Sequence, residues 1–126
     1  MRSTQAWRLV AAGLAVTFAT RAVEAQVVSW SAFLNGAQQV PPVATPGNGR
    51  AFGTLNLGTG ALTWTLTFAN LTSPTTVVAG SPAHIHGPAL PGQNAGILLP
   101  LTGVLAGVTS GTFSGSGTLT LEQVQF

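Results

Sequence analysis

The residues with the clearest potential for chemistry are the two histidines, His84 and His86, which are separated by a single isoleucine. They lie in Ala83-His84-Ile85-His86-Gly87-Pro88, and most of the surrounding residues are apolar, hydroxyl-bearing or glycine. Side chains of a β-strand alternate between its two faces, so we expect both imidazoles on one face and Ile85 on the other. Two imidazoles on one face can chelate a borderline metal ion such as copper or zinc. The sequence therefore predicts a candidate metal site at His84 and His86.

Further ligands for such a site are scarce. From Gln26 onward the chain has no Cys, Asp, Met or Tyr, and Glu122 carries its one side-chain carboxylate. A zinc site normally uses three or four protein ligands. Completion would need Glu122, amide oxygens, a new amino terminus at Gln26, or a second copy of the chain. The alternative is structural: one histidine hydrogen-bonds the loop backbone beside Pro88, and the other is solvated.

The same scarcity argues against catalysis, and we expect a protein that is not an enzyme. General acid–base catalysis uses two titratable groups with separated pKa values, and a carboxylate pair is impossible with one carboxylate. A Ser–His arrangement has no Asp to complete it, and no nucleophile-elbow pattern is present. Gly115-Ser116-Gly117 is not a phosphate loop, because the chain contains no lysine.

The N-terminus has the pattern of a secretory signal peptide. A basic start at Arg2 is followed by the mostly apolar run 9–20, and the small residues Val23 and Ala25 fit the −3 and −1 positions of a cleavage site. We therefore expect cleavage after Ala25, with residues 1–25 as the signal peptide. The run is shorter than the about 20 apolar residues of a spanning helix, so no stable membrane span is expected after cleavage. The predicted location is secreted or periplasmic.

Cleavage would leave a chain of zero formal net charge. Arg50 and Glu122 are the only charged side chains in residues 26–126. A basic patch that could neutralise phosphates is absent, which argues against nucleic-acid binding. A net charge near zero also favours association. Arg50 itself is expected either to be solvated or to steady the proline-rich segment that precedes it.

The elements that would position the histidines have the patterns of β-strands. The clearest is 62–68, in which Leu62, Trp64, Leu66 and Phe68 alternate with threonines and are expected to face the core. It forms a predicted hairpin with 50–57. Further strands are expected at 27–34, 75–79, the histidine stretch, 95–101 and 111–118.

The segments between these strands read as loops and one short helix. The segment 38–49 is expected to be an extended loop, because three prolines exclude a central strand or a helix interior. Thr120 is a candidate N-cap with Gln123 at the third helical position, which predicts a helical turn. Short strands separated by glycine and proline predict an all-β, antiparallel sandwich or barrel.

Several motifs resemble the CHRD domain family, first described in chordin and found widely in bacterial secreted proteins. The first motif is Phe33-Leu34-Asn35-Gly36-Ala37-Gln38-Gln39-Val40-Pro41-Pro42-Val43. The second is Ala83-His84-Ile85-His86-Gly87-Pro88 followed by Gly92-Gln93-Asn94-Ala95-Gly96. The third comprises Gly115-Ser116-Gly117-Thr118-Leu119-Thr120 and Glu122-Gln123-Val124. The resemblance covers roughly residues 30–126, so 26–126 is expected to be a CHRD-like β-sandwich domain.

The resemblance implies an immunoglobulin-like sandwich and a secreted, non-enzymatic module for binding or adhesion. Chordin sequesters extracellular growth factors, but no residue set here matches a growth-factor site. The partner is therefore an unknown protein or small ligand. A small periplasmic or extracellular protein that binds copper or zinc through His84 and His86 is the alternative.

Two departures from the family pattern shape the remaining expectations. Gln39 stands where the family usually has a glutamate, which removes a possible carboxylate. The family's closing strands, with a tyrosine-valine-asparagine-x-histidine-threonine run and a glycine-glutamate-isoleucine-arginine-glycine run, have no counterpart here. We therefore expect a domain that is incomplete at its C-terminal edge. Unpaired strand edges would make it marginally stable or allow a homodimer through those edges.

Overall fold

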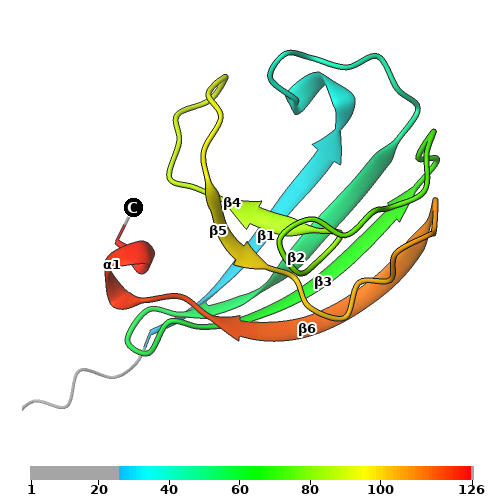
Figure 1. The fold of residues 1–126 in the computed structure, drawn as a ribbon. Helices are drawn as coiled ribbons and strands as arrows, with labels where there is room; N and C mark the ends of the chain where they lie inside the picture. The colour runs from blue at the N-terminus through cyan, green and yellow to red at the C-terminus, as the bar shows by residue number, and fades with distance from the viewer. Residues whose placement is uncertain (1–25, 126) are drawn as a thin grey trace, which may run out of the picture.

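The computed structural model describes residues 26–125, and Figure 1 shows that these residues form mostly β-strands. The strands are β1 (Val27–Asn35), β2 (Asn48–Asn56), β3 (Ala61–Ala69), β4 (His84–His86), β5 (Ile97–Pro100) and β6 (Gly111–Thr118). A 3-10 helix, η1 (Gly36–Gln38), follows β1, and a short helix, α1 (Leu121–Val124), follows β6.

The strands form two antiparallel sheets. The larger sheet has the order β1-β2-β3-β6, and the smaller one pairs β4 with β5. In Figure 1 the short sheet lies across one face of the long sheet, which we call the inner face. The predicted all-β, antiparallel class is confirmed, and the two layers are consistent with a sandwich. The immunoglobulin-like strand order stays a prediction.

The core is built on the inner face of β3. Leu62, Trp64, Leu66 and Phe68 are all buried, as the alternation with threonine predicts. Trp64 is 2% exposed and lies between two glycines, since its cross-strand partners are Gly53 on β2 and Gly115 on β6. A Cβ at Gly115 would lie 2.4 Å from Cζ2 of Trp64, so the indole occupies the space that a side chain would take.

The second layer covers this core with aliphatic side chains. Ile85 of β4 and Leu99 of β5 are cross-strand partners, and both pack against the buried cluster. Leu101 and Val104, which follow β5, are buried within it. The short sheet is therefore held by apolar contact with the long sheet, and its hydrophobic residues define which way its other side chains point.

Burial of the inner face decreases from β3 toward β1. The inner-face residue Leu34 of β1 is 40% exposed, whereas Phe68 in the same cross-strand row is 8% exposed. Trp30 is partly buried, and its Nε1 is a buried donor with no partner among residues 26–125. The β1 side of the sheet is thus the less covered side.

The prediction of a strand over 75–79 is wrong. The segment makes one isolated bridge, between Val78 and Ser81, around a turn in which Ala79 and Gly80 have φ of 45° and 87°. This left-handed turn takes the chain out of an extended path. At the start of the segment, the Thr75 N–H donates to Val108 O over 2.8 Å, so Thr75 pairs with a loop residue and not with a strand.

The predicted helical turn after Thr120 is present. The Thr120 hydroxyl accepts a hydrogen bond from the Gln123 N–H (3.2 Å), and the Gln123 side-chain oxygen accepts one from the Thr120 N–H (2.8 Å). This reciprocal capping box satisfies two backbone donors at the start of α1.

The predicted signal peptide, 1–25, lies outside the described residues. Within 26–125, no helix combines the length and the apolar character that crossing a bilayer requires.

The packing of Trp64 predicts that substitutions at two adjacent positions of β6 differ sharply in their effect on stability. Replacing Gly115 by Ala places a methyl group against a nearly immobile indole, and such overpacking costs about 1–3 kcal/mol. Thermal unfolding followed by circular dichroism should show a melting temperature several degrees lower. The matched control is Ser116→Ala on the exposed face, where changes are usually within about 0.5 kcal/mol. Equal melting temperatures for Gly115→Ala and the parent would contradict this account of the core.

Candidate functional site

The two histidines share one face of the β4–β5 sheet, as their spacing predicts. Ile85 packs into the core, while His84 and His86 both line a surface hollow of about 500 Å³. Their ring centroids are 6.0 Å apart and the rings are nearly perpendicular, at 87°. A register shift between Ile85 and His86 does not move His86 to the other face.

A buried serine fixes the path into this hairpin. Ser81 is 1% exposed, and its hydroxyl donates to the Leu101 carbonyl over 2.6 Å. The Leu101 N–H in turn donates to the Ala83 carbonyl over 2.9 Å. These bonds join the segment that enters β4 to the residue that follows β5, directly beside His84.

Each imidazole uses one ring nitrogen to bond the backbone. His84 donates from Nε2 to Val78 O over 2.6 Å, and His86 donates from Nδ1 to Ala95 O over 2.9 Å. The donor role follows because a carbonyl oxygen only accepts. In a neutral imidazole the second nitrogen then carries a lone pair, so Nδ1 of His84 and Nε2 of His86 are the potential metal ligands.

The structural alternative expected one histidine to bond the loop backbone beside Pro88 and the other to be solvated, whereas both bond a backbone carbonyl, His84 that of Val78 and His86 that of Ala95. The same contact is also the one that orients metal-binding histidines, which usually donate their other N–H to a carbonyl or carboxylate. Within residues 26–125 no group of three or more His, Cys, Asp or Glu side chains comes together. Glu122, in α1, therefore does not complete a site with His84 and His86.

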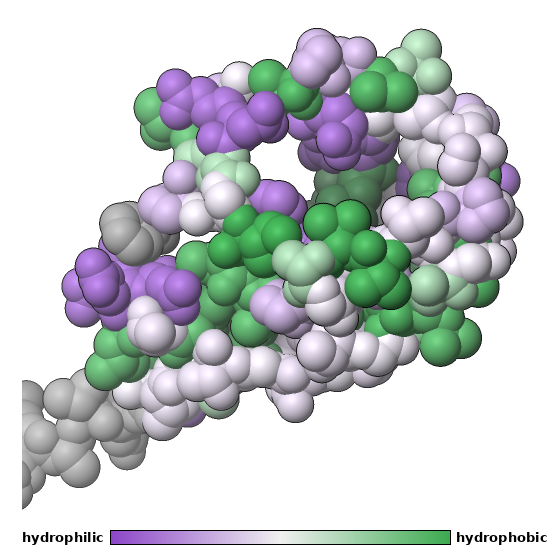
Figure 2. Space-filling view, in the orientation of Figure 1, coloured by the Kyte–Doolittle hydropathy of each residue, from purple (hydrophilic) through white to green (hydrophobic). Residues whose placement is uncertain are grey.

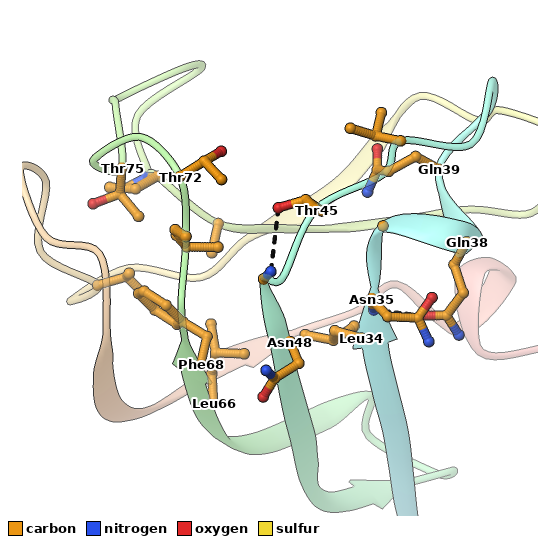
Figure 3. A pocket seen from close by; sticks show the side chains of 17 residues that line it. Leu34, Asn35, Gln38, Gln39, Thr45, Asn48, Leu66, Phe68, Thr72 and Thr75 are labelled. Atoms are coloured by element: carbon orange, nitrogen blue, oxygen red, sulfur yellow. Dashed lines mark hydrogen bonds between the residues drawn. The ribbon is translucent and has the colours of Figure 1, made fainter.

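A larger cleft of about 590 Å³ lies beside the histidine hollow, and Figure 3 shows its lining. Leu66 and Phe68 from β3 form its apolar floor, while Gln38 and Gln39 stand on the side of the proline-rich loop. Thr72 lies on the opposite wall. Figure 2 shows a hollow beneath the upper loops, with hydrophilic surface on the loops and hydrophobic surface deeper in.

Gly36 shapes the proline-rich side of this cleft. Its carbonyl accepts from the Gln39 N–H (3.2 Å) and the Val43 N–H (2.9 Å), so the loop folds back on it. A Cβ at Gly36 would lie 2.2 Å from Val43 O, which explains why glycine follows Asn35 here. The two long motifs also meet, because the Asn94 side chain donates to Val40 O over 3.2 Å.

The cleft and the histidine hollow are contiguous. Five residues line both of them: Thr45, Leu71, Thr72, Thr75 and Pro82. None of these residues is predicted as a site residue from the sequence, and neither is Val104, which follows β5 and also lines the cleft. No local motif marks them, since they meet the motifs through long-range folding alone.

Residues 30–126 match the family model described as CHRD domain. No curated protein and no solved structure gave a match.

Proposed function

We propose, from the premise that this chain belongs to the CHRD domain family, that it is an exported, non-enzymatic binding module whose ligand site is the cleft beside the proline-rich loop. The observation that carries the proposal is the form of the cleft, in which an apolar floor is surrounded by polar groups. Its volume of about 590 Å³ lies in the range of small-ligand sites. The non-enzymatic part of the proposal is supported by the single side-chain carboxylate, Glu122, in residues 26–126, which provides no carboxylate pair for acid–base catalysis.

The chemistry of the lining favours an uncharged peptide segment as the ligand. No charged residue lines the cleft, so a charged ligand group would lose its hydration without gaining a partner. Gln39 offers both the N–H donors and the oxygen of its amide, whereas Gln38 offers its N–H donors and Asn48 its oxygen, because Gln38 Oε1 accepts from the Asn35 N–H and Asn48 Nδ2 donates to Pro46 O. These groups match the N–H and C=O groups of a peptide backbone. Leu66 and Phe68 would then receive an apolar side chain.

Filling the cleft should abolish this binding. Thr72 is exposed on the cleft wall, and Thr72→Trp would place an indole in the ligand's path without altering a buried residue. An array of uncharged peptides would first identify peptides that bind the parent protein. Fluorescence anisotropy would then give their dissociation constants, and we expect these to rise at least tenfold in Thr72→Trp. Thr102→Trp, at an exposed turn outside the cleft, is the matched control. The proposal fails if no peptide binds, or if both variants bind equally well.

Export is the second part of the proposal and has its own test. Expression of the full chain in a bacterial host should yield an extracytoplasmic product that begins at Gln26, because Val23 and Ala25 fit the cleavage positions. Cell fractionation and intact-mass measurement would check both points. Ala25→Arg should block processing. A cytoplasmic product that retains residues 1–25 would overturn the proposal of export.

A second candidate function is metal binding at His84 and His86. The observation that favours it is the fixed orientation of both rings, each of which leaves one nitrogen free. A centroid separation of 6.0 Å is within reach of one shared ion, given metal–nitrogen bonds of about 2.0 Å. Water or groups from a ligand in the adjoining cleft would supply the other positions.

Metal binding predicts a stabilisation that depends on both histidines. An ion that binds only the folded state stabilises it by about 2.7 kcal/mol at 100 times its dissociation constant. Copper or zinc should therefore raise the melting temperature of the purified protein by several degrees. His84→Ala and His86→Ala should each reduce this rise and the double variant should remove it, whereas Glu122→Gln should retain it. An unchanged melting temperature in the parent protein would exclude the site.

A further inference from the structure

The outer face of the four-stranded sheet, which points away from the core, carries an organised set of polar side chains. Cross-strand register aligns hydroxyl groups of β3 with those of β6, and two pairs are bonded: Thr65 with Ser114 and Thr67 with Thr112, each at 3.0 Å. A third pair, Thr54 with Thr63, joins β2 to β3 at 2.7 Å. Most of this face is thus a hydroxyl surface.

One end of this surface holds a cation between two aromatic rings. Arg50 of β2 is the cross-strand partner of Phe33 on β1, and Phe52 follows two residues later on the same face. The Arg50 Cζ is 5.6 Å from the centroid of Phe33 and 5.4 Å from that of Phe52. Cation–π attraction to both rings therefore favours this position of the guanidinium. Phe33 is 69% exposed and Phe52 is 43% exposed, so both rings remain available for contact.

The charge of Arg50 is not neutralised within the part of the chain that the structure describes. It is the one Lys or Arg in residues 26–126, and no ion pair or hydrogen bond joins its guanidinium to another residue of 26–125. A guanidinium carries five N–H donors in a planar fork that fits a carboxylate or sulfate group. A guanidinium that has no acidic partner within 26–125, on a face that is otherwise uncharged, favours an anionic ligand.

A shallow hollow of about 560 Å³ lies next to the fork. Arg50 and Phe52 line it together with hydroxyl side chains from three strands: Ser29, Ser31, Thr54, Thr63 and Thr65. Hydroxyl groups both donate and accept, so they can pair with the hydroxyl groups of a sugar. The exposed rings offer apolar faces for its C–H groups.

We propose that the outer face binds an acidic polysaccharide, with the carboxylate or sulfate of one sugar on Arg50 and the neighbouring sugar ring in the hydroxyl-lined hollow. A single cation does not suit nucleic acid, whose affinity depends on contacts to many phosphates. The hydroxyl-rich hollow and the two ring faces instead fit a ligand that is mostly neutral, with one anionic group per unit. This surface is separate from the peptide cleft, so the two proposals fail independently.

Chromatography of the purified protein on columns of immobilised polysaccharide tests the proposal, with the elution volume as the measure of binding. Polygalacturonate supplies carboxylates, dextran sulfate supplies sulfates, and uncharged dextran is the reference polymer. We expect retardation by one or both acidic polymers, and the stronger one identifies the anion. Arg50→Gln should weaken binding at least tenfold. Arg50→Lys should give an intermediate loss, because it keeps the charge and loses the fork.

Two controls separate recognition from net charge and from sheet stability. Thr102→Asp gives the same net charge as Arg50→Gln at a distant exposed turn and should bind like the parent protein. Phe33→Ser should weaken binding while circular dichroism shows a folded protein. Equal retardation by uncharged dextran, parent-like binding of Arg50→Gln, or an equal loss in Thr102→Asp would each overturn the proposal.

Discussion

The structure depends on one steric constraint, which is that the indole of Trp64 requires a glycine at position 115 of β6. Trp64 lies between Gly53 and Gly115, and its ring fills the space that a side chain at Gly115 would take. A close-packed interior cannot accept a methyl group where an indole edge already lies. Because Gly115 contributes no side chain, the Trp64 indole extends toward β6 and joins the apolar cluster that the second layer covers.

That cluster in turn determines where the histidines point. Ile85 is drawn into the core, and strand alternation then directs His84 and His86 outward to the hollow. The buried Ser81 hydroxyl holds the hairpin against Leu101, so the imidazoles sit on a strand that is anchored on its apolar face. The orientation of the site is thus a consequence of core packing, with the ring nitrogens set afterwards by the carbonyls of Val78 and Ala95.

The difference between local and long-range contacts explains which features could be predicted from the sequence. Strand β3 was predicted to within one residue at each end, and the shared face of His84 and His86 was predicted as well, because both follow from a local period of two. The β-branched run 75–79 has the same local signal, yet tertiary bonds at Thr75 and the turn at Ala79 override it. The cleft lining was not predictable, since it joins loops that are distant along the chain.

The cleft itself follows from the unequal size of the two layers. Two short strands cover part of a four-stranded sheet, and the inner face where Leu34 and Phe68 lie is bordered by loops instead. The proline-rich loop folds back onto the Gly36 carbonyl and does not fill that space as a strand would. An apolar floor therefore stays open beneath loops that carry polar side chains. On the opposite face no second layer is present within 26–125, and threonine and serine keep that surface polar around the one charged side chain, Arg50. Both candidate surfaces therefore arise from how this sheet is covered, since one lies where loops replace a second layer and the other lies on the face that has none within 26–125.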